Sequence, residues 1–572
     1  MSNETKRTST RNGNSKAGKP QIRKAAAARV ARLALAGLIG SALFPLAAAA
    51  RSDPPLSPPG LMPTSEAAED SVARSDEALR AARESSDRKD FSRAAATLRE
   101  ALRDDPENRE LLSLLARVLA WSRHFDESIA AYRKLLALHP DDAFDRAGYA
   151  RALAWSGRSD RSIAEFRRAI AADSTDLETR IGYAHALSWN GDLAGASREY
   201  LEVLKADPRN GDAWLGLATV ARWRDAPTAS DAFTEKAASR GADAEGLKEE
   251  RDAVRLALRP AVGSGWLRHR ERQITSDSTA FKLETVGGFI DGRATLARSV
   301  GILVRGSRLH QWEKNPGNPP DTTLNYDLNS TGIRGDMSFL RRYPVQLAAG
   351  LAYQRFESRN PRVLYPLGQD DDFFGFHSRL WGYFGRFSPS LGVSRDFVAI
   401  KTVDATGGNV LVPGGVTDAG LDLRWDWSGR GHAEGSFSRA TYTDDNERTS
   451  VAGSVGYRIN ARQPRLTLDY GLTWSDFSKP SPSYFTPLES VKHAAGVTAS
   501  GYSERGALDY GARYEFSFLT STNFDDIASN VWSAYLNGTV LGEIPLGVEG
   551  YYSVDNHSYA TWGLTLSGSV RW

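Results

Sequence analysis

The chain has 572 residues, more than one ordinary domain, and it contains no cysteine. This excludes a disulfide framework and thiolate metal sites, and an exported protein can dispense with both. The formal net charge is +2, but residues 1–50 hold nine Lys/Arg against Glu4, so the rest of the chain is net acidic by six charges. A mature chain of that sign is a poor candidate for nucleic-acid binding, and we expect no nucleic-acid partner.

The N-terminal residues have the pattern of an export signal. A long basic stretch precedes the apolar run 33–50, which ends in four alanines. A secretory signal has a basic region, an apolar region and a small-residue cleavage site in this order. We therefore predict a signal peptide over 1–50, with an uncleaved membrane anchor as the alternative. Five prolines predict an extended linker over 51–64.

A period of 34 residues runs through the next region, and three columns of residues keep it in phase. The columns are Trp121, Trp155, Trp189 and Trp223; Ala116, Ala150, Ala184 and Ala218; and Leu98, Tyr132, Phe166 and Tyr200. A helix–turn–helix unit of 34 residues is the tetratricopeptide repeat. We therefore predict an α-solenoid of tetratricopeptide repeats over 65–259, whose default function is protein binding.

Each column has an expected role. The alanines let the two helices of a repeat pack closely, and the aromatic residues fill the gap beside them. Gly157 and Gly191 lie just past a helix, where a left-handed cap suits glycine. The tryptophans have two interpretations, a row that stacks on a ligand or packing between repeats, and strict periodicity favours packing.

From Ala261 onward the hydrophobic period changes to two. Apolar and polar residues alternate in 421–427, 466–474 and 508–518, for example. Runs of about ten residues are long enough to cross a bilayer at a tilt, and the charged alternate face suits a wet lumen. We predict an antiparallel transmembrane β-barrel of about 16 strands over 260–572. A propeller is the alternative, but it needs shorter strands and a blade repeat.

Short turns and longer polar loops alternate along this half. The predicted short turns are at 291–293, 341–344, 386–389, 428–431, 460–464, 503–506 and 542–545. The predicted long loops are 314–322, 360–372, 404–416 and 476–489. Outer-membrane barrels have short periplasmic turns and longer external loops, so both chain ends of the barrel are expected on the short-turn side.

No constellation of residues predicts catalysis, so we expect neither an enzyme nor a cofactor. Charged residues on the polar strand faces are the candidates for the lumen: Asp422, Arg424, Asp426, Asp509, Arg513 and Glu515. We expect them to pair across strands rather than to act as acid and base. Three acidic residues at 370–372 suggest a divalent cation, although a solvated acidic loop is the simpler interpretation.

The last strand, Tyr559–Trp572, is apolar and aromatic on one face and small and polar on the other. This ending resembles the targeting signal of bacterial outer-membrane barrels, which closes on an aromatic residue with an apolar residue two before it. Trp572 and Val570 match that signal, whereas the usual glycine is displaced to Gly568.

The whole arrangement resembles a known group of proteins. The segments 152–158 and 186–191 are similar to the repeats fused to YaiO-type outer-membrane barrels, and the architecture resembles outer-membrane exporters of exopolysaccharides. The resemblance implies a bacterial outer-membrane location with the repeats in the periplasm. It implies outer-membrane lipid, envelope proteins and an exopolysaccharide as partners, and help in exopolysaccharide export as the function. Two alternatives stay open, a non-transporting anchor or scaffold for an envelope complex and a barrel enzyme that modifies lipid or glycan.

Overall fold

A computed structural model of the chain describes residues 65–571. The gaps in that range are 275–278, 298–299, 315–326, 343, 359–370, 404–408, 461–462, 482–484, 504–507 and 541–543. The predicted signal peptide 1–50, the linker 51–64 and Trp572 therefore lie outside the described residues. Within the described range, the predicted fold class is confirmed: helical repeats come first and a closed barrel follows.

The described helices run from Ser65 to Leu258. Their bounds are α2 Ser65–Asp87, α3 Phe91–Asp104, α4 Arg109–Trp121, α5 Phe125–Leu138, α6 Ala143–Trp155, α7 Ser159–Ala172, α8 Leu177–Trp189, α9 Leu193–Ala206, α10 Gly211–Trp223, α11 Pro227–Ala238 and α12 Ala244–Leu258. Local chemistry explains where several of them begin. The side chains of Asn108, Asp142 and Asp176 accept hydrogen bonds from the backbone N–H three residues on, which caps α4, α6 and α8.

The core of the repeat array is made by the predicted small and aromatic columns. The four alanines of the column are fully buried, and the aromatic side chains at 132, 166 and 200 are no more than 2% exposed. A column of glycines, Gly148, Gly182 and Gly216, completes this packing. A Cβ added at Gly182 would lie 3.1 Å from the ring of Phe166, and one added at Gly148 or Gly216 would overlap the tyrosine ring of the preceding repeat. Each aromatic ring therefore needs a glycine in the next repeat.

The turn after each first helix of a repeat has one residue with a left-handed backbone. Gly157 and Gly191 have φ of 75° and 87°, as the sequence predicts. The equivalent positions of the other repeats hold Lys89 with φ 60°, Arg123 with φ 64° and Asp225 with φ 54°. The turn geometry is thus the same in five repeats, and only two of them carry glycine, the residue that adopts it without strain.

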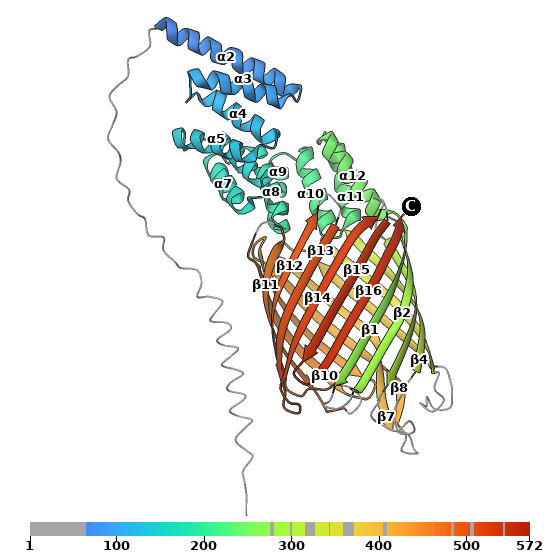
Figure 1. Ribbon diagram of the computed structural model, residues 1–572. Coiled ribbons are helices and arrows are strands. Elements are labelled where there is room, and N and C mark those ends of the chain that lie inside the picture. The colour runs from blue at the N-terminus through green and yellow to red at the C-terminus, as the bar shows by residue number, and fades with distance from the viewer. Residues whose placement is uncertain are drawn as a thin grey trace, which may run out of the picture. The chain divides into compact units, whose positions relative to one another are not determined.

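Sixteen antiparallel strands follow, and Figure 1 shows consecutive strands side by side with β16 next to β1. The strands are β1 Ala261–Ile274, β2 Thr279–Ala297, β3 Val300–Lys314, β4 Asp327–Arg342, β5 Val345–Ser358, β6 Asp371–Gly382, β7 Phe387–Val403, β8 Asn409–Asp426, β9 Gly431–Tyr442, β10 Glu447–Arg458, β11 Arg465–Phe477, β12 Ser490–Ser503, β13 Leu508–Thr520, β14 Ile527–Val540, β15 Ile544–Asp555 and β16 Tyr559–Arg571. The barrel closes through a register that runs from Ala261↔Arg571 to Gln273↔Tyr559. Closure pairs both edge strands, which removes the exposed edges of an open sheet.

Two of the predicted connections are wrong, and the turn predicted at 386–389 comes three residues earlier, at 383–386. The segment 291–293 is not a turn but lies inside β2, which continues to Ala297, and Asp291 accepts a hydrogen bond from Arg305 at 2.8 Å. Asp-Gly is a turn signal in sequence, but here the carboxylate has a cross-strand partner that keeps the strand extended. The segment 409–416 belongs to β8 rather than to a long loop.

The two ends of the barrel differ in their connections. At one end lie the connections 315–326, 359–370 and 478–489, and we call this the long-loop end. The same end also has connections of only three or four residues, such as 443–446 and 556–558, so the predicted alternation is not strict. At the other end, the short-turn end, no connection exceeds that at 459–464. The chain enters β1 at the short-turn end, two residues after α12.

Candidate functional site

The inner face of the barrel is identified by contacts that skip a strand. Arg513 on β13 reaches Asp469 on β11 across β12, which is possible only on the concave side of the wall. The intervening position is Gly496, where an added Cβ would lie 2.7 Å from Asp469 Oδ2. Directly paired residues of antiparallel strands face the same side, so the register assigns every neighbour to a face.

The outer face is apolar. It carries exposed side chains that include Trp266, Ile290, Leu351, Leu421, Phe437, Tyr470, Phe516, Trp532, Leu566 and Val570. The six predicted lumen residues all lie on the opposite, inner face. The alternation of the sequence thus corresponds to an apolar exterior and a polar interior.

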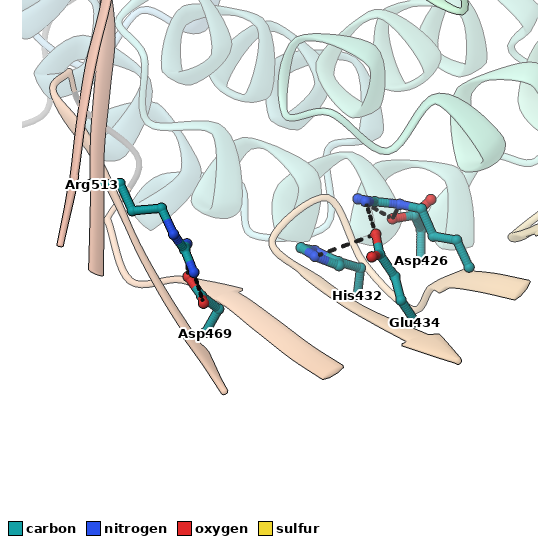
Figure 2. Close-up of polar contacts among 6 residues, drawn as sticks. Asp426, His432, Glu434, Asp469 and Arg513 are labelled. Atoms are coloured by element: carbon teal, nitrogen blue, oxygen red, sulfur yellow. Dashed lines mark hydrogen bonds and ion pairs between the residues drawn. The ribbon is translucent and has the colours of Figure 1, made fainter. Parts of the chain in front are cut away.

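One inner cluster lies near the short-turn end, and Figure 2 shows the residues that form it. Arg424 donates through Nε to Asp426 Oδ1 at 3.0 Å and through Nη1 to Glu434 Oε1 at 2.6 Å. His432 Nε2 lies 4.0 Å from the same Glu434 oxygen. Arg424 and Glu434 are 42% and 47% exposed, so water competes for these contacts, and each pair stabilises the barrel by at most about 1 kcal/mol.

A second inner cluster surrounds Arg513, which is also drawn in Figure 2. Its guanidinium makes two parallel bonds of 2.6 Å to the carboxylate of Asp469 and a third of 2.8 Å to Glu515. Thr498 Oγ1 accepts a further bond at 3.2 Å, and Lys492 lies 3.6 Å from Glu515. Two carboxylates and two cations balance, so the cluster carries no net charge.

The other two predicted lumen residues lie apart from these clusters. Asp422 accepts a hydrogen bond from Ser390 Oγ at 2.9 Å. Asp509 lines a hollow of about 290 Å³ with Tyr535, whose hydroxyl is 3.5 Å away. The prediction of cross-strand pairing therefore describes Arg424 and Arg513 with their partners, and Asp422 and Asp509 have neutral hydroxyl partners instead.

Sequence reasoning did not select Asp469 and Glu434, although both lie at polar positions of alternating runs. Their partners are two strands away or across a turn, and the spacing of a sequence does not show which strands approach one another. Among the described residues, no group of three or more His, Asp or Glu side chains could hold a metal ion. Asp370 of the predicted acidic loop lies outside the described residues, and Asp372 accepts a hydrogen bond from Tyr353 at 2.7 Å.

The repeat array offers a different kind of surface. Trp121, Trp155, Trp189 and Trp223 are the last residues of α4, α6, α8 and α10, and their exposed fractions are 45%, 42%, 44% and 42%. More than half of each indole is therefore covered, and Trp121 on α4 packs against Phe91 on α3 with ring centroids 6.2 Å apart. Packing between repeats, the interpretation that periodicity favours, thus accounts for part of these side chains, and the rest of each indole is presented to solvent. A strict period shows that a position is equivalent in every repeat, but it does not show whether the side chain there is buried or exposed.

Consecutive tryptophans line consecutive hollows, which we call the tryptophan groove. Trp155 and Trp189 line a hollow of about 230 Å³, and Trp189 and Trp223 line the next, of about 500 Å³. The charged residues of the two hollows are Arg151, Glu178, Asp212, Arg222, Asp243, Glu249 and Glu250. Arg222 forms a bidentate pair with Glu250 at 2.9 and 3.0 Å, so most of the remaining charge is acidic.

His185 forms part of the groove wall between these hollows. Its ring stacks on Trp189 with centroids 5.8 Å apart and meets Tyr200 edge-on at 5.7 Å. Burial lowers the pKa of His185 below its usual value of 6.5, so the imidazole is neutral at neutral pH. The groove is therefore aromatic and acidic, with no cationic histidine.

Comparison with known proteins supports the repeat assignment. The tetratricopeptide repeat family matches residues 86–155. No curated protein matches the chain. None of the helices in the described part of the chain is both long and apolar enough to span a membrane.

Three solved structures are similar to parts of this chain. The chain is similar to a bacterial polysaccharide outer membrane secretin, with 11% identity over 54% of this chain and 98% of that chain and a TM-score of 0.37. It is similar to PilW, a widely conserved type IV pilus biogenesis factor, with 20% identity over 33% of this chain and 90% of that chain and a TM-score of 0.28. It is also similar to Pseudomonas aeruginosa pilF, with 17% identity over 33% of this chain and 90% of that chain and a TM-score of 0.28.

Proposed function

We propose that the protein spans the bacterial outer membrane with its barrel, holds its repeats in the periplasm and helps an exopolysaccharide cross the membrane. The observation that carries this proposal is the closed ring of 16 strands with an apolar outer face and a polar inner face. Strands of 12–19 residues are long enough to cross a bilayer at a tilt. Barrels of this size enclose a water-filled channel.

The lumen suits a hydrated and uncharged or weakly charged polymer. The cluster at Arg513 is neutral, and the cluster at Arg424 has one carboxylate more than its single arginine balances, so neither gives a strong field of one sign. Their bonds are partly exposed and individually weak, which lets sugar hydroxyls exchange with them at little cost. A chain of sugars would therefore slide along this wall without a deep binding site.

The covalent connection supports the proposed orientation. Only Arg259 and Pro260 separate α12 from β1, so the array is tethered to the short-turn end of the barrel. Short turns face the periplasm in outer-membrane barrels. The signal peptide over 1–50 and the C-terminal signal at Val570 and Trp572 remain part of the proposal, because they would deliver the chain to this membrane.

The tryptophan groove is the proposed surface for an envelope partner. Exposed indoles supply large apolar contact area, and the excess of carboxylates favours a basic segment of the partner. Replacing Trp155 and Trp189 with alanine in the full-length protein should reduce co-purification of periplasmic proteins crosslinked in cells. A matched control is Trp121→Ala, which lies in the same column but lines neither of the two hollows.

A clean deletion of the gene tests the export function. Secreted exopolysaccharide should fall while the same polymer accumulates in the periplasm, because synthesis continues and passage fails. A strain that lacks only 66–259 should also secrete less, although its barrel should still insert. Unchanged secretion in the full deletion, under conditions where the gene is expressed, would contradict export.

The anchored scaffold is the second candidate, because the tryptophan groove could bind an envelope partner whether or not a polymer passes through the lumen. In that case the deletion leaves glycan secretion unchanged, whereas the Trp155 and Trp189 substitutions still remove the envelope partner. The two outcomes separate the functions, since export requires the lumen and the scaffold does not.

A further inference from the structure

The outer face of the barrel changes character toward the long-loop end of β1, β2 and β3. Trp266 pairs with Gly288 and with Leu566, which places all three on the apolar outer face. Arg268, Arg270 and Arg272 lie on the same face of β1, two, four and six residues after Trp266. Because side chains alternate along a strand, these arginines project from the exterior of the barrel, beyond its apolar belt.

Three cations in this sector share one carboxylate. Glu284 is only 2% exposed and accepts from Arg268 Nε at 2.7 Å and from Arg270 Nη2 at 3.0 Å, and Lys282 Nζ lies 3.5 Å away. One carboxylate cancels one cation, so these four side chains carry a net charge of about +2 at neutral pH. The Nε of Arg270 is buried and has no hydrogen-bond partner among the described residues.

The same face holds two further cations. Arg272 pairs in register with Lys282, and Arg308 pairs with Gly288, so both face outward. Neither has an ion-pair partner in the part of the chain that the structure describes, and both are exposed. We call Arg268, Arg270, Arg272, Lys282 and Arg308 the outer basic cluster, and Glu284 is its one carboxylate.

The cluster is built against the membrane-facing wall rather than free in solvent. The guanidinium carbons of Arg268 and Arg270 lie 5.6 and 5.4 Å from the ring centroid of Trp562 on β16. An indole below and a buried carboxylate beside them hold the two guanidiniums in place. One arginine would be enough to neutralise Glu284. The cluster has five cations and one carboxylate, so four positive charges are not balanced within it.

We propose that the outer basic cluster binds the phosphate groups of an anionic lipid in the outer leaflet, an inference that rests on the proposed placement of the barrel in the outer membrane. Arginine forks match phosphate oxygens with paired hydrogen bonds, and basic residues near a membrane surface attract anionic lipid. The acyl chains of the same lipid would lie on Ile290 and Leu566, which are exposed on the same face toward the short-turn end. Charge and apolar surface are thus arranged in the order of a lipid's headgroup and chains.

The test measures lipid binding to the full-length protein purified in a neutral detergent. The probes are bis-phosphorylated lipid A, the same lipid A after removal of its phosphates, and inorganic phosphate, each followed by native mass spectrometry. The variant is Arg272→Gln with Arg308→Gln, which leaves Glu284 and its partners intact. The matched control is Arg439→Gln, on the outer face at the same end of the barrel but paired with Glu447 at 2.7 Å.

We expect the double variant to bind phosphorylated lipid A roughly 30-fold more weakly, since two basic residues near a membrane surface contribute about that factor. Dephosphorylated lipid A should bind weakly to wild type and variant alike, and inorganic phosphate should bind weakly because it lacks chains. Equal affinity of wild type and double variant, or an equal loss in the Arg439→Gln control, would overturn the inference.

Insertion of the same samples into lipid bilayers separates the two proposals. If the wild type inserts and shows heat-modifiable mobility but no preference for phosphorylated lipid, the lipid site is refuted and the membrane barrel stands. If the wild type does not insert at all, both are refuted.

Discussion

Replacing Gly157 with alanine should loosen one repeat of the array by a calculable amount. Gly157 has φ of 75°, and a Cβ added there would meet no atom within 4 Å. The substitution therefore changes the backbone energy and makes no clash. A left-handed conformation costs a residue with a Cβ roughly 1–2 kcal/mol.

The loss should be local, because repeats interact mainly with their neighbours. Alanine loses less conformational entropy than glycine on folding, by about 0.5–1 kcal/mol, so the net change of about 0.5–1 kcal/mol alters the opening equilibrium by roughly 2–5-fold. Hydrogen exchange followed by mass spectrometry on the full-length protein should show faster exchange by that factor in α6 and α7. Peptides from α10 and α11, two repeats away along the chain, should be nearly unchanged.

The reciprocal substitution provides an internal check. Arg123 occupies the equivalent turn with φ of 64°, so Arg123→Gly should slow exchange in α4 and α5, by about 0.5–1 kcal/mol once the entropy of glycine is subtracted. Gly292→Ala is the matched control, because its Cβ also meets nothing within 4 Å and its φ is ordinary. Unchanged exchange in Gly157→Ala, or slower exchange there, would show that the left-handed turn at 157 does not limit the stability of this repeat.

Two more predictions concern the array. Gly216→Ala places a Cβ 2.2 Å from Cζ of Tyr200 and should cost about 1–3 kcal/mol. This cost is measured as a lower thermal midpoint of the helical circular-dichroism signal, and an unchanged midpoint would show that the two repeats do not pack this way. Burial lowers the pKa of His185 below 6.5 in the folded array, so the unfolded chain takes up the proton first as pH falls. Stability is therefore lost as pH drops from about 6.5 through the folded pKa, and His185→Gln should reduce the difference between thermal midpoints at about pH 7.5 and pH 5. An equal difference in wild type and variant would count against a buried neutral histidine.

The repeat array was largely predictable because each structural requirement recurs every 34 residues. The column of Ala116 and its equivalents is buried, as the small residue in the middle of a helix suggests. The exposure of Trp189 was not predictable, because a period shows that a position is equivalent in every repeat and not which way its side chain faces. The glycines that accommodate Phe166 and its equivalents keep the same period, so inspection of small residues could have found them.

The sequence predicts which side chains of the barrel face inward and which face outward, but it does not predict which residues on different strands bond to one another. Alternation in 508–518 places Arg513 and Glu515 on the inner face, as the structure does. The bond from Arg513 to Asp469 depends on the curvature of the wall and on the absence of a side chain at Gly496, and neither is visible in one strand. The turn predicted at 291–293 failed for the same reason, since the cross-strand partner of Asp291 lies on β3.

A hydrated polymer must be able to enter the lumen if the protein exports one, and thiol labelling tests this most directly. The chain contains no cysteine, so a single Gly471→Cys substitution supplies the only thiol on the inner face. A side chain at 471 has no neighbour closer than 3.7 Å, whereas one at Gly511 would overlap Tyr535, so 471 is the cleaner position. Gly435→Cys is the matched control on the outer face, where an added Cβ has its nearest neighbour at 4.0 Å.

Both variants are reconstituted as full-length protein in lipid bilayers and treated with maleimide-polyethylene glycol of increasing mass. If a polymer can enter the lumen, long polymers should label Cys at position 471 and reduce ion conductance through the barrel. Position 435, covered by lipid, should label slowly and without a conductance change. Labelling of position 471 by a small maleimide but not by the polymers, in barrels that have inserted, would contradict passage of a polymer through the lumen.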